Sequence, residues 1–363
     1  MFLHDLLGLL TDSLDSVLGV CCTTVGTTKP SSVLSIGSRQ YKIVRALGEG
    51  GFSHVLLVED FSSGEQFAAK KIVCQHGMDT YAMAQREIDA YRRFRHPNII
   101  PMVDVLDVPL NTERRPIVTV YMVFPVYKRG NLLDLVMHNQ ETGRRLEESF
   151  IVDVFRAIGE AVRYLHTYSG PLYDNNQEED YDNGLPAVRG YAPLQATDDY
   201  SPSHATPYAH RDIKLGNVML ADDGQTPVLM DFGSCLPARF TAHTRSDALR
   251  IQDDAAENCS MAYRAPELFD VQTGAEFDER TDVWSLGCLL YALAYSHTPF
   301  EDPVAGPAGT SIVLAAINRK YTFPEPDPYS PRLKQLIDFM LEPDPKRRPF
   351  IDQVVSLTDT LYP

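Results

Sequence analysis

The stretch between residues 209 and 233 constrains the fold most, because it sets a few polar residues at fixed spacing around two short apolar runs. The runs, residues 218–220 and 228–230, predict the two strands of a short hairpin. The polar residues before and directly after this hairpin are Asp212, Lys214, Asn217 and Asp231. The spacing therefore predicts a packed hairpin with a polar loop on either side of it.

These four residue types suit the transfer of a phosphoryl group. That reaction needs a carboxylate to orient the attacking hydroxyl, oxygen ligands for Mg²⁺ and a cation near the transferred group. Asp212 supplies the carboxylate, Asn217 with Asp231 the metal ligands, and Lys214 the cation. Together with the neighbouring His-Arg-Asp and Asp-Phe-Gly triplets, the set resembles the catalytic and metal-binding loops of a protein kinase.

Length and composition agree with a soluble enzyme of two lobes. A chain of 363 residues exceeds the size at which a single core is usual. The formal net charge of −16 argues against nucleic acid as a partner, and against a purely electrostatic hold on anionic lipid. The six cysteines show no metal-ligand spacing, which favours free thiols and a compartment facing the cytosol.

Residues 1–38 predict an amphipathic membrane anchor followed by a linker. Apolar residues recur at helical spacing between Leu3 and Leu18, and three aspartates without any lysine or arginine argue against a secretory signal. Phe2 excludes N-myristoylation, but Cys21 and Cys22 are candidates for S-palmitoylation. The alternative is a helix that docks on the body of the protein or on a partner, with two inert thiols.

A strand from Tyr41 leads into a glycine-rich segment in which Ser53 stands at the position of the third glycine of the kinase loop. Glycines there let the backbone approach phosphates without a side-chain clash. Alone, such a segment could equally be a hairpin turn. The residues that we assign to ATP in this segment are Leu47, Gly48, Glu49, Gly50, Gly51, Phe52, Ser53, His54 and Val55.

The next strand carries Ala68 and Lys70, and we expect Lys70 to hold the α- and β-phosphates of ATP. Neighbouring side chains on a strand point to opposite faces, so Lys71 is interpreted as a solvated surface charge. A helical pattern over residues 80–95 then places Glu87 where it would pair with Lys70. Ala68, Lys70 and Glu87 are assigned to the binding of ATP.

A strand over residues 118–123 completes the small lobe, which we place at residues 39–127. Phe124 is expected to guard the back of the adenine pocket, although it could be plain core. Pro125, Val126 and Tyr127 are expected to form the hinge whose backbone binds the adenine edge.

The large lobe, residues 128–363, opens with a core helix over residues 146–166. Residues 167–207 then hold seven acidic side chains against one arginine and show no periodicity, which predicts a disordered surface insertion. The alternative is a docking segment for a basic partner.

Beyond residue 233 the pattern is that of an activation segment. Thr241, Thr244 and Ser246 stand where a phosphate could meet Arg211, and residues 246–257 predict an unusual helix inside the segment. Ser260 occupies the hydroxyl position of serine/threonine kinases, where it can bond Asp212 and Lys214. Further on, we expect Asp282 to brace the catalytic loop, and Glu267 to pair with Arg348.

Finer motifs narrow the resemblance. They are residues 48–53, Gln85-Arg86-Glu87, Pro125 with Lys128-Arg129-Gly130, residues 228–231, the helix pattern of residues 249–256, and residues 263–269. They resemble the Numb-associated kinase family, closest to the branch of the myristoylated and palmitoylated serine/threonine kinase and its fungal vacuolar relatives. The acidic insertion lies outside that pattern.

The resemblance implies an α+β, bilobal fold that uses ATP and Mg²⁺ to phosphorylate serine and threonine on protein substrates. It implies a lipid anchor on the cytoplasmic face of a Golgi or vacuolar membrane, a trafficking role there, and an activation segment held by its extra helix. Without the anchor the enzyme would be cytoplasmic. The alternative is a non-catalytic scaffold of kinase fold, but no catalytic position is missing.

Overall fold

The computed structural model describes residues 33–49, 53–74, 78–110, 117–169, 206–301 and 312–361. The chain forms two compact units, Met1–Ile88 with Pro101–Val126, and Asp89–Ile100 with Tyr127–Pro363. The proposed N-terminal anchor with Cys21 and Cys22, and residues 50–52 of the glycine-rich segment, lie outside the described residues. Each unit is described by itself below.

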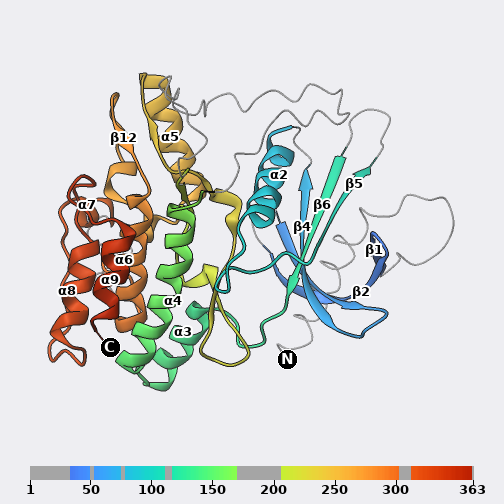
Figure 1. Ribbon diagram of the computed structural model, residues 1–363, viewed down its shortest axis with the longest axis horizontal. Helices are drawn as coiled ribbons and strands as arrows, with labels where there is room; N and C mark the ends of the chain where they lie inside the picture. The colour runs from blue at the N-terminus through green and yellow to red at the C-terminus, as the bar shows by residue number, and fades with distance from the viewer. Residues whose placement is uncertain are drawn as a thin grey trace, which may run out of the picture. The chain divides into compact units, whose positions relative to one another are not determined.

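The first unit is built on a six-stranded antiparallel sheet with the order β1-β2-β3-β4-β6-β5 (Figure 1). Helix α2 starts in this unit, and its last turn belongs to the second unit. The elements are β1 (Val33–Ile36), β2 (Arg39–Glu49), β3 (Ser53–Asp60), β4 (Gln66–Cys74), α2 (Met78–Arg93), β5 (Asp104–Leu110) and β6 (Ile117–Pro125).

Alternation along the strands gives the sheet two different faces. One face carries the apolar core of the unit, in which Tyr41 packs edge to face on Phe67 at 5.9 Å between ring centroids. Because residue pairs opposite each other in an antiparallel ladder share a face, Ala69 joins this core with its partners Leu56 and Val123. The other face carries Lys70 together with the buried side chains of Met122 and Val120.

Two expectations for this unit are wrong. Residues 33–36 were expected in a linker, yet they form β1, whose Leu34 and Ile36 are buried in the core. Four residues with alternating apolar side chains form a strand here because Gly37, at φ 56°, turns the chain directly back into β2, which pairs with them. Lys71 was expected in solvent, but only 4% of it is exposed, because it shares its strand face with Phe67 and Ala69.

The second unit is mainly helical, which confirms the α+β class for the whole chain. Its elements are α3 (Leu132–Thr142), α4 (Glu148–His166), β7 (Tyr208–Ala209), η1 (Leu215–Asn217), β8 (Val218–Leu220), β9 (Pro227–Leu229), η2 (Phe232–Ser234), β10 (Leu236–Pro237), β11 (Phe240–Thr241), α5 (Arg245–Asn258), η3 (Met261–Tyr263), η4 (Pro266–Leu268), β12 (Glu276–Phe277), α6 (Arg280–Tyr295), α7 (Ile312–Ile317), α8 (Pro331–Met340) and α9 (Ile351–Asp359).

Helices α4 and α6 form the centre of this unit. The apolar stripe predicted for α4 is buried, including Ile151, Phe155 and Val162, and it packs against α9 and α6 (Figure 1). Helix α6 is buried on nearly every side, and a Cβ at Gly287 would lie 2.8 Å from Leu341. The expected hairpin is present, since β8 pairs with β9. No helix in the described ranges is both long and apolar enough to cross a membrane.

The expected pair of Glu267 and Arg348 is also present. The guanidinium of Arg348, which is fully buried, donates to both carboxylate oxygens of Glu267 at 2.8 and 2.9 Å. It also donates to the backbone carbonyls of Arg280 and Glu342, so the pair ties α6 and the loop before α9 to η4.

Candidate active site

The residues assigned to ATP gather on one face of the sheet in the first unit. In the register of the strands Lys70 lies opposite Val55, and Ala68 lies opposite Phe124. Since Ala68 and Lys70 are two positions apart on β4, all four side chains share the face opposite the cluster of Tyr41 and Phe67. Phe124 is 6% exposed, and the role of guarding the adenine pocket stays a prediction.

Lys70 and Glu87 form the expected ion pair within the first unit. The Lys70 Nζ lies 2.7 and 2.9 Å from the two carboxylate oxygens of Glu87, whose side chain is 4% exposed. A buried carboxylate needs such a partner, because an unpaired charge away from water is costly. The pair therefore fixes the ammonium group of Lys70 in one place on the sheet face.

The glycine-rich segment is a hairpin in its described parts. Gly48 pairs with Val55, and Glu49 pairs with His54 across β2 and β3. The His54 Nδ1 lies 3.7 Å from Glu49 Oε1. Leu47 and Ser53 belong to the same two strands. At the predicted hinge, Pro125 ends β6, and Val126 and Tyr127 are half-buried.

In the second unit, three donors converge on the carboxylate of Asp212. The Lys214 Nζ lies 2.7 Å from Oδ2, the Asn217 amide donates to Oδ2 at 2.9 Å, and the backbone N–H of Ser260 donates to Oδ1 at 3.0 Å. Lys214 also donates to the Ser260 hydroxyl at 2.8 Å. The predicted contact of Ser260 with both residues is thus present, by its hydroxyl to Lys214 and by its amide to Asp212.

Asn217 and Asp231 offer the oxygen atoms that a hard cation prefers. The Asn217 Nδ2 donates to Asp212 twice, so its carbonyl Oδ1 is the atom left to act as a ligand. Asp231 follows β9 with a left-handed backbone, φ 64° and ψ 74°. Mg²⁺ is commonly held by one or two carboxylate or amide oxygens together with substrate phosphates. The residues present fit that ion.

Asp282 braces the catalytic loop as expected. Its two carboxylate oxygens accept the backbone N–H groups of His210, at 2.7 Å, and Arg211, at 2.8 Å. Burial alone would raise the pKa of Asp282, but the hydrogen bond from His166 and the charge nearby hold that pKa below its usual value. The carboxylate thus remains ionised, and it fixes a turn in which Arg211 has φ 70°.

Two residues that support the site were not predicted from the sequence. His166, whose side chain is 1% exposed, donates from the end of α4 to Asp282 at 3.1 Å. Nothing in the local pattern distinguishes it from a core residue. The hydroxyl of Tyr91 accepts the N–H of Asp231 at 3.0 Å. Tyr91 is four residues after Glu87 on the same helix face, and this spacing could have indicated it.

The activation segment contains the expected helix, α5. Its C-terminal end is joined to the catalytic loop, since Arg211 Nη2 lies 2.5 Å from Asp254. Asn258 in turn donates to Asp254 and accepts from the hydroxyl of Ser234. Arg211, expected to meet a phosphate, is thus paired with a carboxylate of α5.

The three hydroxyl residues of the segment lie at or before the start of α5. Thr244 caps the helix and exchanges hydrogen bonds with Asp247, Ser246 follows in the first turn, and Thr241 lies in β11. Phosphorylation at any of them stays a prediction.

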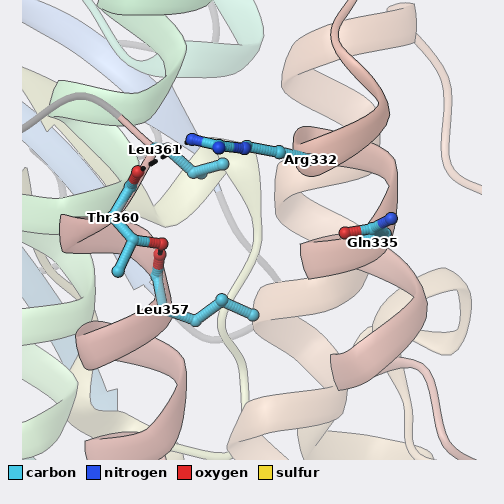
Figure 2. A pocket seen from close by; sticks show the side chains of 5 residues that line it. All are labelled: Arg332, Gln335, Leu357, Thr360 and Leu361. Atoms are coloured by element: carbon cyan, nitrogen blue, oxygen red, sulfur yellow. Dashed lines mark hydrogen bonds between the residues drawn. The ribbon is translucent and has the colours of Figure 1, made fainter.

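A cavity of about 270 Å³ lies elsewhere in the second unit, between α8 and the end of α9, and Figure 2 shows the side chains that line it. It is lined by Arg332, Gln335, Leu357, Thr360 and Leu361, and Arg332 donates to the carbonyl of Thr360 at 3.4 Å. None of these residues belongs to the sets described above.

A family model for the protein kinase domain matches residues 41–170 and 202–358, so the chain belongs to the protein kinase family. The match leaves out residues 171–201, inside the acidic insertion.

Within this family the similar proteins include serine/threonine kinases. The chain is 36% identical to human serine/threonine-protein kinase 16 over 328 residues, which cover 90% of this chain and 92% of that protein. It is 32% identical to the fission yeast serine/threonine-protein kinase ppk13 over 329 residues, 91% and 92% of the two chains. It is 29% identical to serine/threonine-protein kinase ENV7 of Saccharomyces cerevisiae over 349 residues, 91% and 94% of the two chains. The predicted branch is confirmed, and the chain is a serine/threonine protein kinase.

Proposed function

We propose that the chain transfers the γ-phosphoryl group of ATP to serine and threonine hydroxyls of protein substrates, using Mg²⁺. The observation that carries this proposal is the carboxylate of Asp212, held by three donors with Lys214 beside it. A carboxylate so placed can accept hydrogen bonds from the acceptor hydroxyl and orient it. The alternative, a non-catalytic scaffold of kinase fold, has no such observation in its favour.

The other site residues take the following roles in the proposal. Lys70, fixed by Glu87, holds the α- and β-phosphates, and Lys214 stabilises negative charge on the transferred group. Asn217 and Asp231 would hold Mg²⁺, which neutralises phosphate charge when bound. Asp212 takes the proton of the attacking hydroxyl as the hydroxyl oxygen bonds to the γ-phosphorus. The bond between the γ-phosphorus and the bridging oxygen breaks, and ADP leaves.

The acceptor class can be tested with peptide mixtures that differ only in a central serine, threonine or tyrosine. With labelled ATP, we expect label on the serine and threonine mixtures and at least tenfold less on tyrosine, because a phenol would place the reacting oxygen several ångströms farther from the backbone. Labelling of tyrosine at a comparable rate would refute the serine/threonine assignment.

We also propose that the pairing of Arg211 with Asp254 takes the place of an activating phosphate. A phosphate on the segment would act by supplying negative charge to this arginine. Asp254 supplies that charge from α5. The hydrogen bond between Ser234 and Asn258 holds the end of the helix beside residues 231–234, called the metal loop below. The kinase would then need little activation at Thr241, Thr244 or Ser246.

For the N-terminal 32 residues, we propose an anchor on the cytoplasmic face of a Golgi or vacuolar membrane, where the kinase would act in trafficking. The apolar stripe and the paired Cys21 and Cys22 support it. A single acyl chain gives only marginal binding, each buried methylene contributing about 0.8 kcal/mol, so two chains or one chain with the helix are needed.

We expect the double variant Cys21→Ser and Cys22→Ser to leave the membrane fraction for the soluble fraction, because its acyl chains are gone. The measurement is cell fractionation with a clickable palmitate label, against organelle markers. Thr23→Ala with Thr24→Ala, next in the sequence, is the matched control and should stay with membranes. Retention of the cysteine variant would mean that the helix or a protein partner holds the kinase.

A further inference from the structure

The acidic insertion enters and leaves the second unit at a closed root. The backbone N–H of Thr206 donates to the carbonyl of Tyr168 at 2.9 Å, so the two ends of the insertion are fastened together. From Thr206 the chain runs through Pro207 into β7, which pairs with β10 of the activation segment. The insertion was expected to span residues 167–207, but Tyr168, Thr206 and Pro207 belong to the folded unit.

Aromatic rings connect this root to the interior. Phe94, 2% exposed, receives the rings of Tyr168 and Tyr208 edge to face, each at 5.2 Å between centroids. Tyr168 and Tyr208 also meet each other edge to face at 6.0 Å. Arg93 donates to the hydroxyl of Tyr208, and its guanidinium carbon lies 4.9 Å from the centre of that ring. The root is thus packed on the segment that follows α2.

The same Phe94 touches the metal loop. Its ring lies 5.9 Å from the ring of Phe232, which also contacts Tyr91 at 5.2 Å and His210 at 4.9 Å. Phe232 is 1% exposed and stands next to Asp231. One ring, that of Phe94, therefore separates the insertion root from Phe232.

Asp231 depends on such support. A left-handed backbone is uncommon for residues other than glycine, although aspartate and asparagine adopt it more often than most, and the surroundings help to hold Asp231 in it. Here the surroundings are the hydroxyl of Tyr91, which accepts the Asp231 N–H, and the packing of the adjacent Phe232. Anything that loosens Phe232 should let Asp231 relax from this conformation.

We propose that Tyr168 and Tyr208 are positioning residues for the metal loop, so that the root of the insertion determines how firmly Phe232 and Asp231 are held. The proposal rests on the proposed role of Asp231 toward Mg²⁺. A change in the path of the chain at Tyr168 or Thr206 would reach Phe232 through Phe94, without any contact with ATP or substrate.

The test is Tyr168→Leu in the full chain, with hydrogen–deuterium exchange of residues 230–234 measured in the absence of nucleotide and metal. Tyr168 forms three edge-to-face ring pairs, with Phe94, Tyr164 and Tyr208. Losing one such pair corresponds to roughly a 3- to 10-fold effect, so exchange there should be at least about 3- to 10-fold faster. In activity assays the Mg²⁺ concentration for half-maximal rate should rise by a similar factor, while KM for the peptide stays unchanged. Tyr168→Phe keeps the ring and should restore wild-type values.

Two further variants keep the test decisive. Thr206→Pro removes the N–H that closes the root without deleting any ring. The loosened root should shift Tyr168 on Phe94 and so also speed exchange at residues 230–234, even if Tyr168→Leu does not fold. Tyr321→Leu is the matched control, because Tyr321 belongs to a separate ring cluster with Tyr291 and Phe300. It should leave that exchange unchanged.

Unchanged exchange in both root variants, or an equal rise in Tyr321→Leu, would overturn the proposal. Since exchange is measured without turnover, it decides this point even if the chain transfers no phosphate. Absence of transfer in the wild-type protein, with exchange responding as stated, would instead count against the proposed function alone.

Discussion

Replacing Asp212 with asparagine should lower kcat for phosphate transfer by about 100- to 10,000-fold, the usual contribution of a positioned proton acceptor. The amide is nearly the same size and keeps one acceptor oxygen for the Ser260 N–H, while Lys214 and Asn217 lose their acceptor, so the fold should be retained with a modest loss of stability. It can no longer take a proton from the acceptor hydroxyl. KM for ATP should change little, because our assignment of ATP's binding residues does not include Asp212.

The measurement is steady-state transfer from labelled ATP to a serine peptide, with melting temperature recorded alongside. Asp253→Asn is the matched control, because Asp253 is an exposed carboxylate on α5. It should retain wild-type kcat. An Asp212→Asn variant within threefold of wild type would show that the carboxylate does not carry the reaction.

The second large effect is expected for Asp231→Asn, which should lower kcat by about 100- to 1000-fold, the loss typical of one removed electrostatic contact in a transition state. Asparagine tolerates a left-handed backbone better than most residues do, so the variant should keep the backbone conformation of residue 231, φ 64°. The variant therefore isolates the negative charge that would hold Mg²⁺.

This prediction is checked by varying Mg²⁺ at saturating ATP. The half-saturating concentration should rise at least tenfold in Asp231→Asn, whereas it should be unchanged in Asp253→Asn. Exchange at residues 230–234 should stay close to wild type, in contrast to Tyr168→Leu. Equal Mg²⁺ dependence of variant and wild type would remove Asp231 from the metal site.

Much of this arrangement could be predicted because its signals are local. The hairpin of β8 and β9 fixes the distance along the chain between Asn217 and Asp231, so their roles follow from spacing. Strand alternation separates Lys70 from Lys71, and the position two residues after Ala68 correctly selected Lys70 as the lysine that meets Glu87. Alternation does not show whether the strand face that carries Lys71 is buried, and Lys71 was therefore wrongly expected in solvent.

What could not be predicted depends on contacts between segments distant in sequence. Asp254 was one of several acidic residues on a helix, and nothing near it in the chain indicates that Arg211, 43 positions earlier, is its partner. Tyr168 and Thr206 lay inside a segment without periodicity, and only the folded unit brings them together. Partners of this kind are chosen by tertiary packing rather than by local propensity.

Phosphate transfer by the purified wild-type chain measures whether this kinase domain is catalytically active. Labelled ATP is supplied with and without Mg²⁺ to the wild type, to Asp212→Asn and to Asp253→Asn, and the labelled amino acids are identified. Active transfer predicts phosphoserine and phosphothreonine with wild type and Asp253→Asn, only in the presence of Mg²⁺, and near-background label with Asp212→Asn. Background label in all three proteins, or equal label in all three, would contradict the claim.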